Sequence, residues 1–241
     1  MTAQTVPAAT ATPSLQVAPG ALWPVIRPVV PALLLGFLVL GLLFHTEAVV
    51  AVQTWIDSTA YSHCFFVIPI AIYLAMDRRP TLAGVSVQPM PAVTLAVLAL
   101  ALAWLAADWL GIMEGRQLVA MSLLELLFLA VLGRRMFFVL SAPLLYLFFL
   151  VPFGAFVTPA LQGFTAHFID VGLGILGIPH VVDAYFIEIP EGRFVVAEAC
   201  AGLRFLIASI AFGVLYACLM YRGIWRRLGF VAASIIVPVI A

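Results

Sequence analysis

Residues 203–221 read LRFLIASIAFGVLYACLMY, and Arg204 is the one charged residue in this stretch. A helix needs roughly 20 mostly apolar residues to cross the hydrocarbon core of a bilayer. The stretch therefore predicts a membrane span, which we extend to Ala199–Tyr221. Similar runs recur along the chain, and the candidate spans are Val25–Phe44, Tyr61–Met76, Pro91–Leu110, Gln117–Leu132, Met136–Val151, Ala199–Tyr221 and a last one starting at Leu228.

The composition supports a lipid environment. Of the 241 residues, 65% are hydrophobic and 9% are charged, whereas a soluble domain has about 25% charged residues. A soluble fold of this size could not bury so much apolar surface. We expect an all-α polytopic membrane protein with about seven spans. The formal net charge of zero gives no reason to expect nucleic acid as a partner, and the three cysteines show no metal-ligand spacing. No metal or other cofactor is expected.

The arginines predict the orientation of the spans. If the spans alternate, eight of the eleven basic residues fall on one side, and positively charged loops face the cytoplasm. The amino terminus is then cytoplasmic. The eight are Arg27, Arg78, Arg79, Arg134, Arg135, Arg222, Arg226 and Arg227. The opposite side receives most acids, namely Glu47, Asp57, Asp108, Glu114, Asp170, Asp183, Glu188 and Glu191.

The longest outer segment, 152–198, has two halves. The first half is apolar but broken by Gly, Pro, His167 and Asp170, and it fits either a helix in the membrane interface or a re-entrant hairpin. The second half reads YFIEIPEGRFVVAEA, in which two β-prone runs flank Pro-Glu-Gly. This pattern predicts a small β-hairpin that rests on the membrane domain.

The ends of the chain differ from the rest. Residues 1–24 are rich in Ala, Thr and Pro, which predicts a disordered cytoplasmic tail before a transmembrane domain at 25–241. Leu228–Ala241 supplies 14 residues, fewer than the roughly 20 that a span needs. We therefore expect an incomplete final span and a truncated chain.

One segment carries candidate chemistry, at the outer start of the sixth span. If Cys200 lies in the first helical turn, the helix N-terminus favours its thiolate, which is the reactive form. Arg204, four residues later, would share a helix face with Cys200 and stabilise negative charge. Glu198 would cap the helix and hold Arg204. The alternative is a buried structural cysteine beside an ordinary Glu–Arg pair.

The segment GRFVVAEACAGLRFLIAS, residues 192–209, resembles the active-site signature of exosortases, which contains Glu-Ala-Cys-Ser-Gly-Leu-Arg. YSHCFFVIPIAIYLAMDRR, residues 61–79, resembles a second signature of the family, and LGFVAASIIVPVIA resembles the start of a later span. The resemblance runs through residues 25–241 in order. Two positions differ from the family, since Ala201 replaces the usual Ser and Cys64 replaces the usual Gly.

The resemblance implies a membrane-embedded cysteine protease or transpeptidase of the bacterial inner membrane. Its active site would face the periplasm, with Cys200 as nucleophile. Its partners would be membrane-anchored proteins with carboxy-terminal Pro-Glu-Pro sorting tags, and its setting exopolysaccharide or biofilm production. Complete members have about eight spans, and their catalytic Arg and His would follow Ala241.

Three further positions are open to more than one interpretation. His63 could line the active site or be a hydrogen-bonded structural histidine. Glu125 could belong to a proton path or be protonated and hydrogen-bonded within the bundle, and the sequence favours the second. His167 and Asp170 could share a face, but a metal site there would need a third ligand. A Cys64–Cys200 disulfide is conceivable but would block the nucleophile.

Two other functions compete with the enzyme. A transporter or assembly component for exopolysaccharide export would line a midplane path with polar residues, which are scarce in these spans. A scaffold without a site would leave the cysteine signature unexplained.

Overall fold

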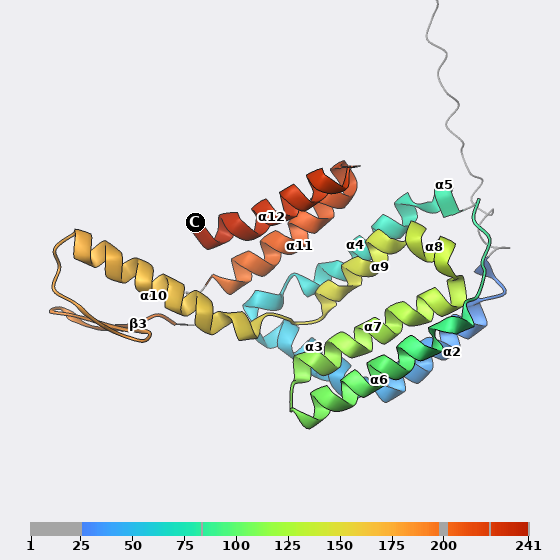
Figure 1. Ribbon diagram of the computed structural model, residues 1–241, viewed down its shortest axis with the longest axis horizontal. Helices are drawn as coiled ribbons and strands as arrows, with labels where there is room; N and C mark the ends of the chain where they lie inside the picture. Colours follow the sequence, from blue (N-terminus) through green and yellow to red (C-terminus); the bar gives the residue numbers. More distant parts are fainter. Residues whose placement is uncertain (1–25, 83, 198–201, 222, 241) are drawn as a thin grey trace, which may run out of the picture.

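The computed structural model describes residues 26–82, 84–197, 202–221 and 223–240, which form a mostly helical molecule (Figure 1). The whole predicted tail, residues 1–24, lies outside the described residues. Within the described ranges, four helices are long and apolar enough to cross a membrane, and up to six spans result if each of two bent helix pairs counts as one. The four are Thr59–Asp77, Pro91–Trp109, Met113–Leu132 and Leu203–Met220. A multi-spanning α-helical protein is therefore confirmed, whereas the count of seven spans is not.

The described helices follow the chain in a simple order. They are α2 (Val30–Leu43), α3 (His45–Asp57), α4 (Cys64–Asp77), α5 (Arg79–Leu82), α6 (Thr94–Trp109), α7 (Met113–Leu132), α8 (Arg134–Val139), α9 (Ser141–Tyr146), α10 (Thr158–Ile175), α11 (Leu203–Met220) and α12 (Ile224–Ile240). Short 3-10 turns separate some of them, namely η1 (Thr59–Tyr61), η2 (Pro91–Val93), η3 (Leu147–Leu150) and η4 (Ala155–Val157). The last helix thus begins four residues before the predicted Leu228.

The first predicted span, Val25–Phe44, does not end in an outer loop. Instead α3 follows α2 at an angle of 77°. Phe44 leaves the helical backbone region at the junction, and the Nδ1 atom of His45 lies 3.1 Å from the carbonyl oxygen of Leu42. A side chain that competes for a helix carbonyl weakens the regular ladder. The bend turns Glu47 inward, where its side chain is 3% exposed.

The predicted span Met136–Val151 is wrong as one continuous helix. It divides into α8, α9 and η3 because Pro143 lacks the N–H that a regular helix needs, and because Ser141 Oγ donates to the carbonyl of Phe138 at 2.9 Å. The segment Ser141–Leu150 then meets Ala155–Ile175 at 64°, as in a broken span or a re-entrant loop.

The outer segment forms a small lobe from α10 and three strands, β1 (Val181–Asp183), β2 (Phe186–Ile189) and β3 (Gly192–Val195). The strands form an antiparallel sheet in the order β1-β2-β3. The β2–β3 hairpin confirms the prediction, whereas the three-residue β1 was missed. Ala166 of α10 packs on Ile187 and Val196, so the helix covers one face of the sheet. Figure 1 shows this lobe extending away from the bundle.

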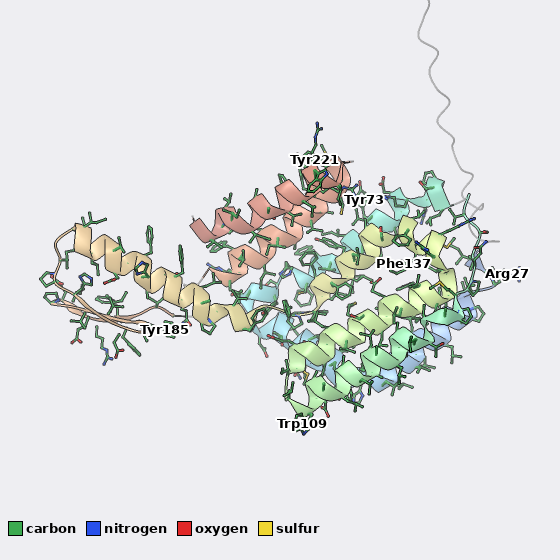
Figure 2. All side chains as sticks on the ribbon, viewed as in Figure 1. Arg27, Tyr73, Trp109, Phe137, Tyr185 and Tyr221 are labelled. Atoms are coloured by element: carbon green, nitrogen blue, oxygen red, sulfur yellow. The ribbon has the colours of Figure 1, made fainter. Side chains whose placement is uncertain are left out.

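Arginines gather towards one end of the bundle, and aromatic side chains lie at both ends. Figure 1 places the start of α2, α5, α8 and the α11–α12 connection towards one end, where the predicted cytoplasmic arginines gather. Figure 2 shows Arg27 and Tyr221 on that side and Trp109 at the opposite end. Aromatic residues at both ends are typical of the two bilayer interfaces.

Candidate active site

The segment that contains Cys200 lies between β3 and α11. Residues 198–201, and with them Glu198 and Cys200, lie outside the described residues. The chain on either side of the segment is described, so the positions of residue 197 before it and Gly202 after it are known.

The chain before Cys200 is held firmly by the outer lobe. Val196 is buried, and its N–H donates to the carbonyl of Tyr185 at 2.8 Å. The carbonyl of Val196 accepts from Nε2 of Gln162, a buried residue of α10, at 2.9 Å. Helix α10 and the sheet therefore fix the backbone four residues before the candidate nucleophile.

Helix α11 begins four residues after the predicted start of the sixth span at Ala199. It begins at Leu203, and Gly202, its N-cap, adopts the left-handed conformation with φ 71°. A left-handed residue does not continue a helix, so α11 does not extend back through Gly202. Cys200 lies outside the described residues, and the helix face that it was predicted to share with Arg204 stays a prediction.

Arg204 lies in the first turn of α11, exposed, with its guanidinium carbon 4.7 Å from the ring centroid of Phe205. Among the described residues it forms no ion pair. Its predicted partner Glu198 lies outside them. Arg204 is thus an exposed cation close to the segment of the nucleophile.

The start of α11 has two neighbours that are distant in the sequence. The turn η1 packs against α11. Gly154, at φ 127°, approaches the helix so closely that a Cβ atom there would lie 3.7 Å from Cδ1 of Leu203 and 3.5 Å from Cδ1 of Ile207. The loop between η3 and η4 therefore lies beside the start of α11. The turn η1, which precedes α4, also packs on this helix.

His63 is the N-cap of α4, next to η1. Its Nδ1 atom is buried and has no hydrogen-bond partner in the described part of the chain. Its Nε2 atom lies 3.9 Å from Sγ of Cys64. A purely structural histidine is expected to have both ring nitrogens hydrogen-bonded. The Nδ1 atom of His63 has no such partner among the described residues, so it is free to bind a further group.

Tyr61 is a polar residue that the sequence analysis did not select. Its side chain is 5% exposed, and its hydroxyl has no hydrogen-bond partner among the described residues. A buried hydroxyl without a partner is costly. The signal was present in the sequence, because Tyr61 opens the Tyr-Ser-His run that resembles the second signature.

Cys64 has a structural role in the described part of the chain. It is a free, buried thiol whose S–H donates to the carbonyl of Phe149 at 3.2 Å. The next carbonyl, of Leu150, accepts from Nε1 of Trp55 at 3.0 Å. These two hydrogen bonds give partners to the last two carbonyl groups of η3, after which the backbone turns towards α10.

Asp170, which could share a helix face with His167, pairs with a different histidine. His167 is exposed, while Asp170 Oδ1 lies 2.9 Å from Nε2 of His180. Nδ1 of His180 lies 2.7 Å from the carbonyl oxygen of Ile178. No group of three or more His, Cys, Asp or Glu residues that could hold a metal occurs within the described ranges.

This pair makes the stability of the outer lobe pH-dependent. Hydrogen bonds to the Ile178 carbonyl and then to the Asp170 carboxylate raise the pKa of His180 above its ordinary value. Because the pKa of His180 is higher in the folded lobe, the pair contributes its full stabilisation below the unfolded-state pKa of about 6.5. This stabilisation is lost as the pH rises through the folded-state pKa of His180. We expect hydrogen-exchange protection of the β1 and β2 amides, corrected for intrinsic rates, to fall over this range. Asp170→Asn should flatten the dependence, and equal pH dependence in both proteins would contradict it.

Glu125 of α7 is 6% exposed, and both carboxylate oxygens lack a hydrogen-bond partner among the described residues. The predicted hydrogen bond within the bundle is therefore not found. Glu125 is not among the residues near the start of α11.

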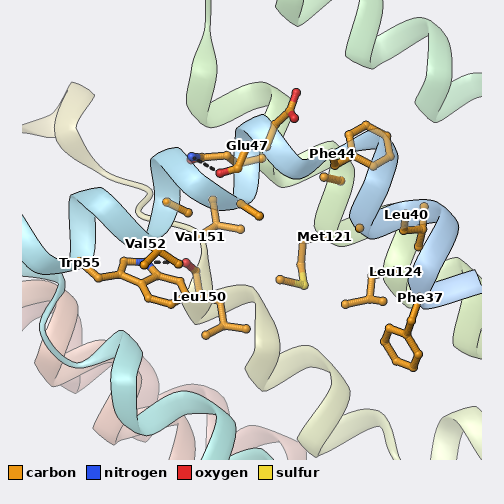
Figure 3. Close-up of a pocket in the computed structure, with 15 residues that line it drawn as sticks. Phe37, Leu40, Phe44, Glu47, Val52, Trp55, Met121, Leu124, Leu150 and Val151 are labelled. Atoms are coloured by element: carbon orange, nitrogen blue, oxygen red, sulfur yellow. Dashed lines mark hydrogen bonds between the residues drawn. The ribbon is translucent and has the colours of Figure 1, made fainter. Parts of the chain in front are cut away.

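An apolar cavity lies elsewhere in the bundle. It has a volume of about 300 Å³ between α2, α3, α7 and η3 (Figure 3). Apolar side chains such as Phe37, Met121 and Leu124 line it, and Glu47 stands at one end. Of the candidate site residues that the structure describes, His63 and Arg204 do not line this cavity.

Fold and site together define a multi-spanning helical membrane protein in which a lobe of α10 and three strands precedes a cysteine-bearing segment and the start of α11. The family described as transmembrane exosortase matches residues 55–241, more than half of the chain. The chain belongs to this family. No curated protein and no solved structure matches it.

Proposed function

We propose that this protein is a membrane-embedded cysteine protease or transpeptidase that cleaves the carboxy-terminal sorting signals of exported proteins. The observation that carries the proposal is the match to the transmembrane exosortase family across the cysteine signature. The structure supports it by anchoring the chain at Val196 and starting α11 at Leu203. His63 supports it as well, since it lies near the start of α11 with an unpaired Nδ1 atom.

In the proposed reaction, the thiolate of Cys200 attacks the carbonyl carbon of the scissile peptide bond. The C–N bond breaks, the departing amine takes a proton, and the amino-terminal product remains as a thioester on Cys200. Water or an acceptor amine then attacks the thioester and restores the thiol. Arg204 and the start of α11 would stabilise the oxyanion, His63 would orient a reacting group, and Glu198 would position Arg204.

The proposed setting is the bacterial inner membrane, with the amino terminus in the cytoplasm and Cys200 facing the periplasm. Seven spans in residues 25–241 would fit the charge distribution. The substrate is anchored in the same bilayer by an apolar helix, so the attack is effectively intramolecular and weak recognition of the cleavage site suffices. The proposed biological link is exopolysaccharide or biofilm production.

Thiol labelling tests the placement of the nucleophile. In cells with a permeabilised outer membrane, an impermeant maleimide should modify Cys200, identified by peptide mass spectrometry. Cys64, at 1% exposure, should remain unmodified as an internal control. A cysteine introduced by Arg79→Cys, at the arginine-rich end, should react only after the inner membrane is opened. Modification of Cys200 only after that opening would contradict the proposed orientation.

A further inference from the structure

The outer edge of β3 presents backbone groups that have no partner in the described part of the chain. In an antiparallel pair, hydrogen-bonded residue pairs alternate with pairs whose N–H and C=O groups point away. The N–H of Val196 bonds to Tyr185, and the register pairs Phe194 with Ile187. The N–H and C=O groups of Arg193 and Val195 therefore point away from β2.

No described element covers this edge. The sheet order is β1-β2-β3, so β3 has one strand neighbour. Helix α10 packs against β2, and no backbone or side-chain hydrogen bond from the described residues reaches the main chain of Arg193 or Val195. The side chain of Val195 is 56% exposed. An uncovered edge strand is a template for pairing with another chain.

We propose that the edge of β3 binds the substrate as an added β-strand and thereby delivers the scissile bond to Cys200. This inference rests on the proposed function, because it takes the substrate to be a peptide segment. Strand addition uses main-chain hydrogen bonds for affinity and the alternating side chains for selectivity. The N–H and C=O groups of Arg193 and Val195 provide two donors and two acceptors for such a strand.

The position of β3 along the chain favours a substrate segment as the occupant. Cys200 follows Val195 by five residues, and the backbone between them is fixed at Val196 by Tyr185 and Gln162. Figure 1 shows β3 on the side of the lobe that leads back to α11. A peptide paired with β3 is therefore held beside a strand whose last residue, Val195, precedes the nucleophile by five positions.

The side chains along the edge favour a particular kind of segment. The Arg193 guanidinium carbon lies 4.5 Å from the ring centroid of Phe186, on the face that also carries Val195. Glu188, the register partner of Arg193, lies on the same face, so both charges are present beside the edge. Val195 and Phe186 provide apolar contact there, and the edge fits an extended segment with apolar side chains.

Proline at position 195 tests the proposal. Val195→Pro removes one outward N–H, and edge strands tolerate proline where the N–H faces outward. Cleavage of a membrane-anchored tagged reporter by the whole protein should fall by at least about 10-fold in kcat/KM, since a main-chain hydrogen bond is lost and the ring obstructs the added strand. Val195→Ala keeps the N–H and should stay within about threefold of the unchanged protein. Equal activity of the two variants would overturn the proposal.

Hydrogen exchange gives a second readout that does not depend on the proline variant. In the Cys200→Ala protein in lipid vesicles, the reporter should slow exchange of the Arg193 and Val195 amides. The Phe194 amide, already paired with β2, should change little. Protection of Arg193 and Val195 before the reporter is added would overturn the proposal in favour of lipid or, where it depends on protein concentration, of a second copy.

The cleavage assay separates the proposed nucleophile from the proposed strand-addition site. If Cys200→Ala still cleaves the reporter, the proposed function itself fails. If Cys200→Ala is inactive while Val195→Pro and Val195→Ala cleave equally well, the nucleophile stands and the strand-addition site is wrong.

Discussion

Cys200→Ala in the whole protein is expected to reduce cleavage of a tagged membrane reporter by at least roughly 1000-fold, as removal of a covalent nucleophile does in other peptidases. The reason is chemical, because no thioester forms without the sulfur atom and direct attack by water lacks the activated nucleophile. The measurement is the initial rate of reporter cleavage in native membranes at matched protein levels.

Cys218→Ala is the matched control for this experiment. Cys218 is a free, partly buried cysteine on α11, the helix that follows Cys200. Its replacement should leave the rate within about threefold, because it removes a similar side chain far from the proposed reaction. Loss of cleavage in both variants with equal loss of folded protein would point to stability, and full cleavage by Cys200→Ala would contradict the nucleophile.

Arg116→Met is expected to destabilise the bundle by about 3–5 kcal/mol, because it leaves a buried carboxylate without its cation. Nη2 and Nε of Arg116 donate to Oε1 of Glu47 at 2.7 and 2.9 Å. Trp104 Nε1 donates to the same oxygen at 3.2 Å, and Nη1 of Arg116 lies 2.8 Å from Asp108 Oδ1. Glu47 is 3% exposed, so water cannot replace these contacts.

A double variant separates lost charge pairing from lost packing. Glu47→Leu combined with Arg116→Met should recover most of the stability, because apolar replacement of both partners of a buried pair is often neutral or favourable. Arg79→Met, at an exposed arginine, should change the unfolding free energy by less than about 0.5 kcal/mol. Unfolding in detergent measures all three. If Arg116→Met matches Arg79→Met, the buried pair does not stabilise the fold.

The helices that the sequence predicted well are those in which hydrophobicity alone determines the outcome. The predicted Tyr61–Met76 and Pro91–Leu110 correspond to the observed Thr59–Asp77 and Pro91–Trp109. The hairpin was also predictable, because the turn Pro-Glu-Gly separates two β-prone runs that pair as Ile187 with Phe194. In these elements the local signal and the final structure agree.

The bends were not predictable from hydrophobicity. The 77° angle between α2 and α3 lies in a helical stretch, and its stabilising partner Arg116 is distant in the sequence. The alternation of spans did predict that Glu47 and Asp108 lie on one side, and the structure joins both to Arg116 in one cluster. It could not show which of them pair.

The sequence selected the candidate site residues, and the structure adds the geometry of the described chain around them. Hydrophobicity placed the start of the sixth span at Ala199, but Gly202 adopts a left-handed conformation and α11 begins after it. The proximity of η1, His63 and the start of α11 joins segments about 140 residues apart, which no local pattern encodes. The unpaired hydroxyl of Tyr61 likewise appears only after the bundle has packed.

Trapping the covalent intermediate tests the account most directly. The whole protein in native membranes is incubated with the tagged reporter, quenched with acid and analysed by peptide mass spectrometry. The account predicts that the amino-terminal part of the reporter is joined to Cys200 through a thioester that neutral hydroxylamine releases. Efficient cleavage with unmodified Cys200 at every time point, or a thioester on Cys64 or Cys218 instead, would contradict it.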